Sequence, residues 1–499
     1  MSVAWWRMVR AEWTKLRSVR SWTAGPAAGL LAVFVVAVVT AAGSSTRCEV
    51  NDTVAACPKP PIGPGGQAVE DYPSFLQREL TGDGSVTVRV ASLSGTVPWA
   101  KAGLLLKDGL RPGASYAAVM VTAGHGVRLQ HDFTEDVAGS TGQGARWLRL
   151  TRAGPIVTGA ESADGRRWRT IGAVRPAGLG ERVRVGVFAA SPDELRVVRA
   201  DLGGVIARAR PATATGVFDH LTFSGTLTGG LTHTGTGTGG TGTGGTGTGG
   251  AGAGGAGAGG AGQAGGVLTV RGSGDVAPLG VHGGVTSQQV LTGVVLALIA
   301  VIVVSAVFVT SEYRRGLIAV SLLASPRRGR VLAAKAVVAG SLTFAGSLVA
   351  LTAGVLVSMA ILRAGGAYVL PVGRLAEAGV VAGSAAMLAL TAVLAVGLGA
   401  WLRRAAPAVV VAVGLVVLPY VLATSSLLAP PVGRWLLRVS PAAGFAVQQS
   451  VPAYPHVTGG GLPQEGAFPL PGWAGLLVLA GYAALAMALG LRRLTRGDA

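Results

Sequence analysis

Six carboxylates in the middle of the chain are the first residues whose types suggest chemistry. A carboxylate pair, one acid and one base or nucleophile, is what glycoside hydrolysis requires. Most of the six lie in predicted turns, where Asp commonly accepts backbone hydrogen bonds. We therefore expect structural roles and assign no catalytic residue among Asp108, Asp132, Glu135, Asp136, Glu161 and Asp164.

Four aromatic or imidazole side chains lie in the same stretch: Trp99, Tyr116, His125 and Trp168. Exposed rings of this kind would bind a glycan or the cell wall, whereas buried ones would fill the core of a domain. Both readings stay open at this point.

Two further chemistries depend on motifs. Cys48 and Cys57 enclose a short loop, so a local disulfide is expected if this segment faces an oxidising compartment. No Cys/His pattern has zinc spacing, and no metal site is predicted. A phosphate-binding loop needs a Gly-Lys pair, which the chain lacks. We expect no bound cofactor and no ATPase activity in this chain.

Composition indicates the elements that position these residues. Half of the 499 residues are hydrophobic, 13% are charged and the mean hydropathy is +0.52, whereas about 25% of an ordinary soluble domain is charged. A bilayer is crossed by about 20 apolar residues in a helix. Six stretches qualify: Trp22 to Ala42, Val290 to Thr310, Val337 to Leu362, Leu375 to Leu402, Ala405 to Leu428 and Trp473 to Leu491.

The net charge of +19 is distributed unevenly. With the N-terminus in the cytoplasm, sixteen basic residues lie in cytoplasmic segments, against four in the two short outer loops. This asymmetry predicts a multi-pass plasma-membrane protein with both termini cytoplasmic and residues 43–289 outside. It explains the charge without a nucleic-acid partner. Glu377 and Lys335 lie near span ends, where we expect them to reach the interface.

Residues 43–289 change character in order. A Cys/Pro/Gly spacer is followed by eight short alternating runs: Ser85 to Val90, Gly103 to Leu106, Tyr116 to Val121, Val127 to Gln130, Trp147 to Thr151, Ile156 to Ala160, Val183 to Ala189 and Val217 to Phe223. The pattern predicts an all-β sandwich, with a hairpin turn at Asp164-Gly165. The Thr/Gly and Ala/Gly tract from Thr228 to Gly266 predicts a flexible tether that lets the sandwich move independently of the bundle.

The sandwich region also resembles known folds. The phrases WAKAGLLLKDG, YAAVMVTAGHGVRLQ, WLRLTRAG, SADGRRW and VGVFAASP are similar to those of concanavalin-like, laminin-G-like jelly-roll domains of bacterial extracellular proteins. The resemblance implies a fold and not an activity, because such folds carry many functions.

The membrane segments resemble another family. The phrases RAEWTKLRSVRSW, TSEYRRGLIAVSLLASPRRGRVLAAK and LLRVSPAAGFAVQQ are similar to those of type-2 ATP-binding-cassette exporter permeases. That resemblance implies an interfacial elbow helix with Glu12, Trp13, Lys15 and Arg17. It also implies a coupling helix that docks on a separate ATPase, which would bind ATP and Mg²⁺. For this contact we assign Glu312, Tyr313, Arg314, Arg315, Gly316, Pro326, Arg327 and Arg328.

The predicted architecture is a polytopic α-helical membrane protein of six transmembrane helices with an inserted β-jelly-roll sandwich. Its parts are an elbow helix (1–21), the first span (22–42), a spacer (43–71), the sandwich (72–225), a linker (226–287), spans two to six (288–491) and a tail (492–499). The expected partners are an ATPase, a second permease chain, lipid and an extracellular glycan. The competing hypotheses are a membrane-anchored glycan- or cell-wall-binding protein and a surface enzyme; six spans exceed what an anchor needs.

Overall fold

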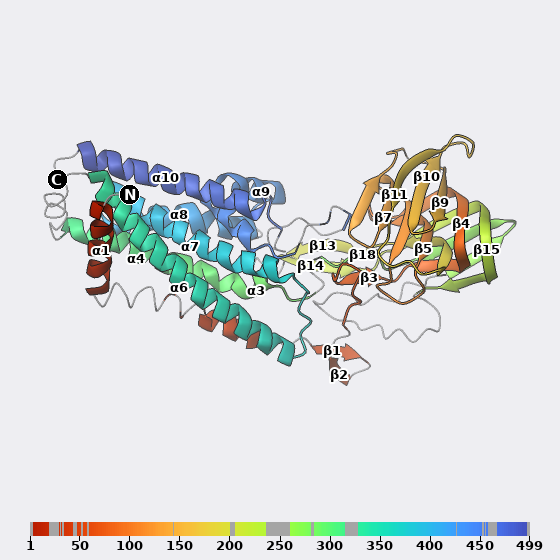
Figure 1. The fold of residues 1–499 in the computed structure, drawn as a ribbon, viewed down its shortest axis with the longest axis horizontal. Coiled ribbons are helices and arrows are strands. Elements are labelled where there is room, and N and C mark those ends of the chain that lie inside the picture. The colour runs from red at the N-terminus through yellow and green to blue at the C-terminus, as the bar shows by residue number, and fades with distance from the viewer. Residues whose placement is uncertain are drawn as a thin grey trace.

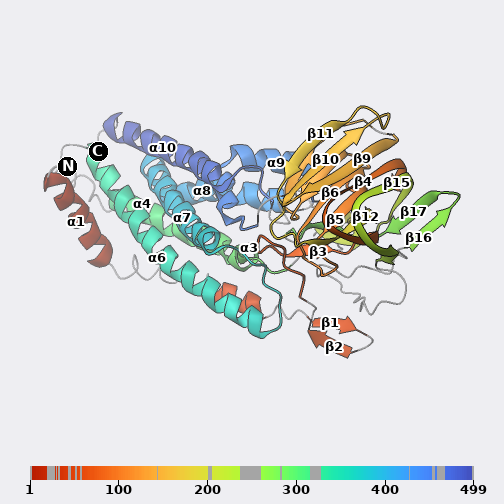
Figure 2. The ribbon, with the colours of Figure 1, turned by 45° about the vertical axis from the view of Figure 1, so that its right-hand side comes forward.

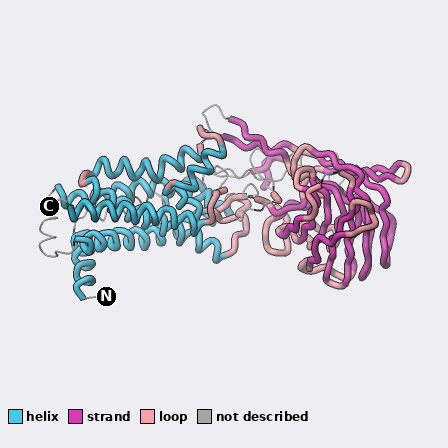
Figure 3. Tube along the Cα trace, turned by 90° about the horizontal axis from the view of Figure 1, so that it is seen from above, coloured by secondary structure: helices cyan, strands magenta, loops and turns pink. Residues whose placement is uncertain are grey.

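The chain forms a bundle of helices with a β-rich domain at one end (Figure 1). The structure is a computed structural model, and it describes residues 3–18, 29, 31, 34–42, 47–50, 53–56, 59–142, 144–199, 205–235, 260–280, 284–314, 328–425, 427–451, 454, 456–457 and 467–496. Seen from above, the helices and the strands occupy separate halves of an elongated molecule (Figure 3).

Five described helices are long and apolar enough to cross a membrane: Ser287–Arg314, Arg328–Ala364, Arg374–Leu402, Ala405–Thr424 and Gly472–Arg496. The helices are α1 (Val3–Ser18), α3 (Ser287–Val290), α4 (Val294–Arg314), α6 (Arg328–Ala364), α7 (Arg374–Leu402), α8 (Ala405–Thr424), α9 (Pro430–Val439) and α10 (Gly472–Arg496), with 3-10 turns η2 (Leu291–Gly293) and η3 (Pro441–Gln448). These five helices correspond to predicted spans two to six.

Of the predicted first span, residues 22–42, the structure describes residues 29, 31 and 34–42. Its described part at 34–42 is helical, and Ala37 and Ala41 belong to the buried core of the bundle. Five of the six predicted spans therefore have a described helix of sufficient length, and the sixth remains a prediction.

Small residues let the long helices approach closely. A methyl group added at Gly397 of α7 would lie 2.6 Å from the backbone of Ala486 and Met487 in α10. Gly475 of α10 faces the Ala443 carbonyl oxygen of η3 in the same way, at 2.1 Å. Since apolar side chains gain little by leaving lipid for a protein interior, close backbone packing of this kind holds membrane helices together.

The strands form one large folded sheet that encloses a hydrophobic core (Figure 2). Its path is β11-β10-β9-β4-β12-β5-β6-β7-β8, and β15, β16 and β17 join beside β4. The strands are β3 (Val69–Asp71), β4 (Ser74–Gly95), β5 (Lys101–Lys107), β6 (Tyr116–Thr122), β7 (Gly126–His131), β8 (Glu135–Ala138), β9 (Arg146–Ala153), β10 (Ile156–Ser162), β11 (Arg169–Val174), β12 (Arg182–Ala190), β15 (Ala214–Thr234), β16 (Gly260–Ala264) and β17 (Val267–Gly272).

Three two-stranded sheets complete the fold: β1 (Arg47–Val50) with β2 (Thr53–Ala56), β13 (Glu194–Arg199) with β14 (Val205–Arg210), and β18 (Val276–Pro278) with β3. All eight predicted runs lie in strands of the large sheet, because their alternating apolar residues fill its core. The hairpin turn is also confirmed: Gly165 has φ +73, and β10 and β11 pair on either side of it.

The Gly-rich tract was predicted to link the sandwich to the bundle, but its described ends belong to the sandwich. Its start belongs to β15 and its end to β16 and β17, which pair with one another. The stretch 236–259, outside the described residues, thus connects strands of the sandwich and does not join the sandwich to the bundle. The outgoing strand β18 pairs with the incoming strand β3, and only Leu279 to Thr286 separate β18 from α3.

We predict that Gly397→Ala lowers the stability of the bundle by about 1–3 kcal/mol, because the added methyl group forces α7 away from α10. Gly414→Ala in α8 is the matched control, since nothing lies within 4 Å of its added methyl group. It should be neutral or slightly stabilising through helix propensity. Thermal unfolding of both purified variants in detergent measures the difference, and equal midpoints would contradict the packing argument.

Candidate functional site

A buried group of three charges lies where α1 crosses the end of the long helices (Figure 1). The Lys335 Nζ atom on α6 is 2.6 Å from Glu12 Oε2 on α1 and 2.6 Å from Glu312 Oε1 on α4. The three side chains are between 1% and 4% exposed. We call Glu12, Lys335 and Glu312 the ion triad.

The surroundings of the ion triad are apolar. The Lys335 ammonium lies 5.0 Å from the centre of the Phe308 ring, and Val9 of α1 packs on the cluster that contains Phe308 and Leu332. Elsewhere on α1, Trp6 and Trp13 are 60% and 42% exposed. The helix therefore buries one face on the bundle and presents Trp side chains outward, as a helix at a membrane interface does.

The position of Lys335 differs from the sequence expectation. An interfacial lysine would extend its ammonium into water, but this one is 1% exposed. An ammonium in a low-dielectric interior needs anions beside it, and Glu12 and Glu312 supply them. One feature of the sequence could have indicated this pairing. Glu12 and Glu312 are acidic residues within strongly basic segments.

Of the other residues assigned to coupling, Tyr313, Arg314 and Arg328 are described and the rest lie outside the described residues. Arg314 is exposed at the end of α4, and the Arg403 guanidinium lies 5.6 Å from the Tyr313 ring centre. Arg328 donates a hydrogen bond to the Leu494 carbonyl oxygen of α10. Arg315, Gly316, Pro326 and Arg327 lie outside the described residues, as do the side chains of Lys15 and Arg17.

The ion triad is a connection between three helices. It joins α1 to α4 and α6, and these two helices flank the segment 315–327 that the sequence assigns to coupling. Any displacement of one helix end must carry the other two or separate buried opposite charges.

The aromatic residues considered for glycan binding are mostly covered. Trp99 is 5% exposed and stacks on His125, with ring centres 4.0 Å apart. Tyr116 is 1% exposed and packs edge-on against Phe133, and burial raises its pKa well above the usual value. Trp168, on a turn, is half-buried beneath the Arg149 guanidinium at 3.9 Å. Trp99 and Tyr116 therefore serve the interior of the sandwich.

The candidate carboxylates are engaged in structural hydrogen bonds. Asp132 accepts from the Ser115 hydroxyl and from the backbone N–H of Ala177. Burial alone would raise the pKa of Asp132, but hydrogen bonds from His131, Ser115 and backbone groups lower it overall.

Glu161 follows the same pattern. It accepts from Ser140 and Arg169, and these bonds lower its pKa although burial opposes them. At the hairpin, backbone N–H groups of Arg167 and Arg166 lower the Asp164 pKa to about 2.

The general acid of a glycosidase needs a raised pKa. The pKa values of Asp132, Glu161 and Asp164 are lowered instead. Asp136 accepts hydrogen bonds from Arg128 and Gln130, and Asp108 accepts one from the backbone N–H of Gly180. Glu135 is exposed.

Two further predicted features have limited coverage. Cys48 lies in β1 opposite Ala55 of β2, while Cys57 lies outside the described residues, so the disulfide stays a prediction. Among the described residues, no group of three or more His, Cys, Asp or Glu side chains is arranged to hold a metal ion.

Two buried lysines of β5 form ion pairs that the sequence interpretation missed. Lys101 Nζ lies 2.5 Å from Asp275 Oδ1 just before β18, and Lys107 pairs with Asp71 of β3. Both lysine side chains are at most 5% exposed. The two lysines are six residues apart and so lie on one face of β5, a spacing that was visible in WAKAGLLLKDG. These pairs hold the incoming and outgoing strands of the sandwich against the large sheet.

Comparison with known proteins gives little further guidance. No protein-family model matches this sequence, and neither does any curated protein. Several solved structures share a likeness with part of this chain, among them three proteins. A glycoside hydrolase family 43 protein from Bacillus licheniformis is 14% identical over 21% of this chain and 24% of that protein, with a TM-score of 0.18. A functionally unknown protein from Saccharomyces cerevisiae is 16% identical over 35% and 97%, with a TM-score of 0.18.

The third is scytalido-glutamic peptidase, 8% identical over 42% of this chain and 100% of the peptidase, with a TM-score of 0.24. The chain spans about a quarter of the glycoside hydrolase. Likenesses at these scores support no conclusion about activity.

We predict that Lys335→Met destabilises the bundle by about 3–5 kcal/mol, because two buried carboxylates then lose the cation between them. Arg374→Met is the control, since Arg374 is exposed at the start of α7. Replacing the whole ion triad, with Glu12→Gln and Glu312→Gln added, should recover most of the loss. Thermal unfolding in detergent provides the measurement. If Lys335→Met melted like the wild type, the ion triad would not be holding α1.

A second prediction concerns Glu70 on β3, whose carboxylate accepts from the Asp275 backbone N–H. Burial, followed by the charge of Asp275, raises its pKa to about 7. The protonated form is thus favoured in the fold: the stability it contributes is complete below pH 4.5 and is lost as the pH rises through about 7.

Glu70→Gln should therefore stabilise the sandwich at pH ~8 by up to about 3 kcal/mol, and should have little effect at pH ~4. Circular dichroism of strand unfolding in the full chain measures this. Glu135→Gln, on an exposed carboxylate, is the control. An equal response of both variants at pH ~8 would contradict the prediction.

Proposed function

We propose that this chain is the membrane-spanning permease subunit of an ATP-binding-cassette exporter. In this proposal six helices cross the plasma membrane, both termini are cytoplasmic and the β-sandwich is extracellular. A separate ATPase subunit hydrolyses ATP with Mg²⁺, and two permease chains assemble with two ATPases. The buried core of the bundle consists mainly of Ala, Leu and Val side chains, which carry no group that would select one substrate.

The ion triad is the observation that carries the proposal. It joins α1, which resembles an elbow helix, to the two helices that flank the coupling segment. A permease needs such a connection because force from an ATPase arrives at short cytoplasmic segments and must reach the spans. A simple membrane anchor has no use for a buried charged junction between three helices.

Two further features support the proposal. The five long apolar helices share one buried core, so the bundle is an integrated unit and not a set of separate anchors. The chain also lacks a phosphate-binding loop, so energy from ATP would have to come from a partner.

Purification of the tagged full chain from its own membranes tests the proposal. A soluble ATPase with a phosphate-binding loop should co-purify and hydrolyse ATP. The double variant Arg314→Glu/Arg315→Glu should retain about tenfold less of this ATPase, because charge reversal disrupts docking. Arg434→Glu/Arg438→Glu is the matched control: it reverses two exposed arginines at the opposite end of the bundle.

Failure to recover an ATPase with the wild-type chain would count against the permease proposal. If both double variants retained the ATPase equally, docking through the 312–330 segment would be excluded.

A further inference from the structure

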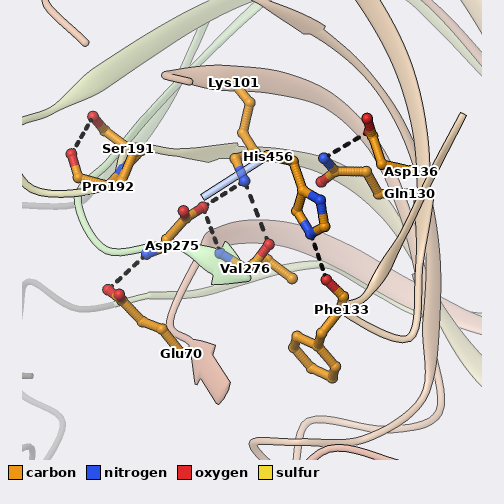
Figure 4. A network of polar contacts seen from close by, with 10 residues as sticks. All are labelled: Glu70, Lys101, Gln130, Phe133, Asp136, Ser191, Pro192, Asp275, Val276 and His456. Atoms are coloured by element: carbon orange, nitrogen blue, oxygen red, sulfur yellow. Dashed lines mark hydrogen bonds and ion pairs between the residues drawn. The ribbon is translucent and has the colours of Figure 1, made fainter. Parts of the chain in front are cut away.

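A histidine from the bundle is buried in the sandwich (Figure 4). His456 belongs to the segment between η3 and α10 and is 1% exposed. Its Nε2 atom lies 2.7 Å from the carbonyl oxygen of Phe133, at the turn between β7 and β8. Because a carbonyl oxygen can only accept, Nε2 carries the proton of this bond. In the neutral ring Nδ1 is then bare, and it has no hydrogen-bond partner among the described residues.

Aromatic rings complete the site in the sandwich that the His456 side chain occupies, which we call the seat. The edge of its ring meets Trp99, with ring centres 6.3 Å apart and an interplanar angle of 77°. Trp99 is itself stacked on His125 and covered by the Arg128 guanidinium at 5.4 Å. The Trp99 ring, considered above for glycan binding, is thus occupied by two histidines, one of them from the bundle.

The same region holds the connection between sandwich and bundle. Lys101 pairs with Asp275 and donates to the Val276 carbonyl oxygen, which fixes the outgoing strand. A methyl group added at Gly280, just beyond that strand, would lie 3.9 Å from Val457. The incoming strand, the outgoing strand and the His456 segment therefore converge at one side of the sandwich, which argues against independent movement of the two parts.

We propose that His456 is a pH-sensitive clip: its neutral imidazole holds the sandwich on the bundle, and its protonation releases it. The inference concerns contacts within this chain, so it does not rest on the proposed ATPase partner.

The chemistry of the seat favours the neutral ring. Protonation would place a proton on Nδ1, where no acceptor is found among the described residues, and a charge in a site that excludes water. Burial is the largest influence on the His456 pKa and lowers it from 6.5; the Phe133 bond opposes this effect and Lys101 adds to it. Several charged and titratable groups surround the His456 ring: Tyr454 of its own segment at 6.0 Å between ring centres, Lys101 of β5, His125 and Arg128 at β7, Asp136 of β8, Asp275 before β18, and Glu70 of β3 behind Asp275.

The sign of the effect follows from the lowered pKa. A released histidine titrates near 6.5, whereas the docked one resists protonation to a lower pH. Docking is therefore at full strength above pH 6.5, and it weakens as the pH falls from there to the lowered pKa.

Electron–electron distance measurements on the full chain in lipid nanodiscs test the clip. Spin labels are placed at Arg167→Cys on the sandwich and Leu375→Cys on α7, because these side chains are 96% and 91% exposed. Cys48→Ser and Cys57→Ser remove the native thiols. The background chain should give a narrow distance distribution at pH ~7.5 and a broad one at pH ~5.

Three variants identify the group whose titration changes the distance distribution. His456→Gln keeps an N–H donor but does not titrate, so its distribution should stay narrow at both pH values. His456→Ala removes the bond and should be broad at both. His220→Gln, at a histidine whose side chain is 63% exposed, should behave like the background chain.

Two results would overturn the proposal. A narrow distribution for His456→Ala would show that the histidine does not hold the sandwich. A pH response that persisted in His456→Gln would assign the titration to another group, of which Glu70 is the first to examine.

Discussion

An ammonium group removed from water must have an anion beside it, and this requirement fixes the junctions of the molecule. Lys335 joins α1 to α4 and α6 through Glu12 and Glu312. Lys107 and Lys101 hold the incoming and outgoing strands of the sandwich through Asp71 and Asp275. Each pair joins segments that are distant in sequence or separate as elements. Because breaking one partner leaves a buried charge, these contacts specify which elements meet.

The bundle between these junctions follows a different rule. Its helices are apolar on nearly all sides, so hydrophobicity alone does not choose their neighbours. Gly397 and Gly475 allow backbones to come within contact distance, and small residues around them shape the surfaces of α7, α10 and η3. The glycines of the chain thus serve different purposes: close helix packing in the bundle, turns such as that at Gly165, and the low-complexity tract within the sandwich.

The mechanical relation between the two parts follows from connectivity. The Gly-rich tract lies between strands of the sandwich, while the actual connection to the bundle is short and begins at the paired strands β3 and β18. With His456 bonded to Phe133 as a further contact, the sandwich is seated on the bundle. A movement of α10 would therefore displace the sandwich, and a sandwich held in place would restrict the movement of α10.

Local patterns in the sequence were enough to predict most of the helices and strands. Hydrophobic length predicted the five long apolar helices, two-residue alternation predicted eight strands, and Asp164-Gly165 predicted a hairpin, because each signal depends on neighbouring residues. Which charges meet depends on how distant segments fold together. Lys335 lies near the end of a predicted span, as an interfacial lysine would. No neighbouring residue indicated that it instead pairs with Glu12, which is more than 300 residues away. His456 in an irregular loop had no local signal at all. Pairing of buried charges and the seating of a loop depend on the three-dimensional meeting of distant segments, which composition and periodicity do not encode.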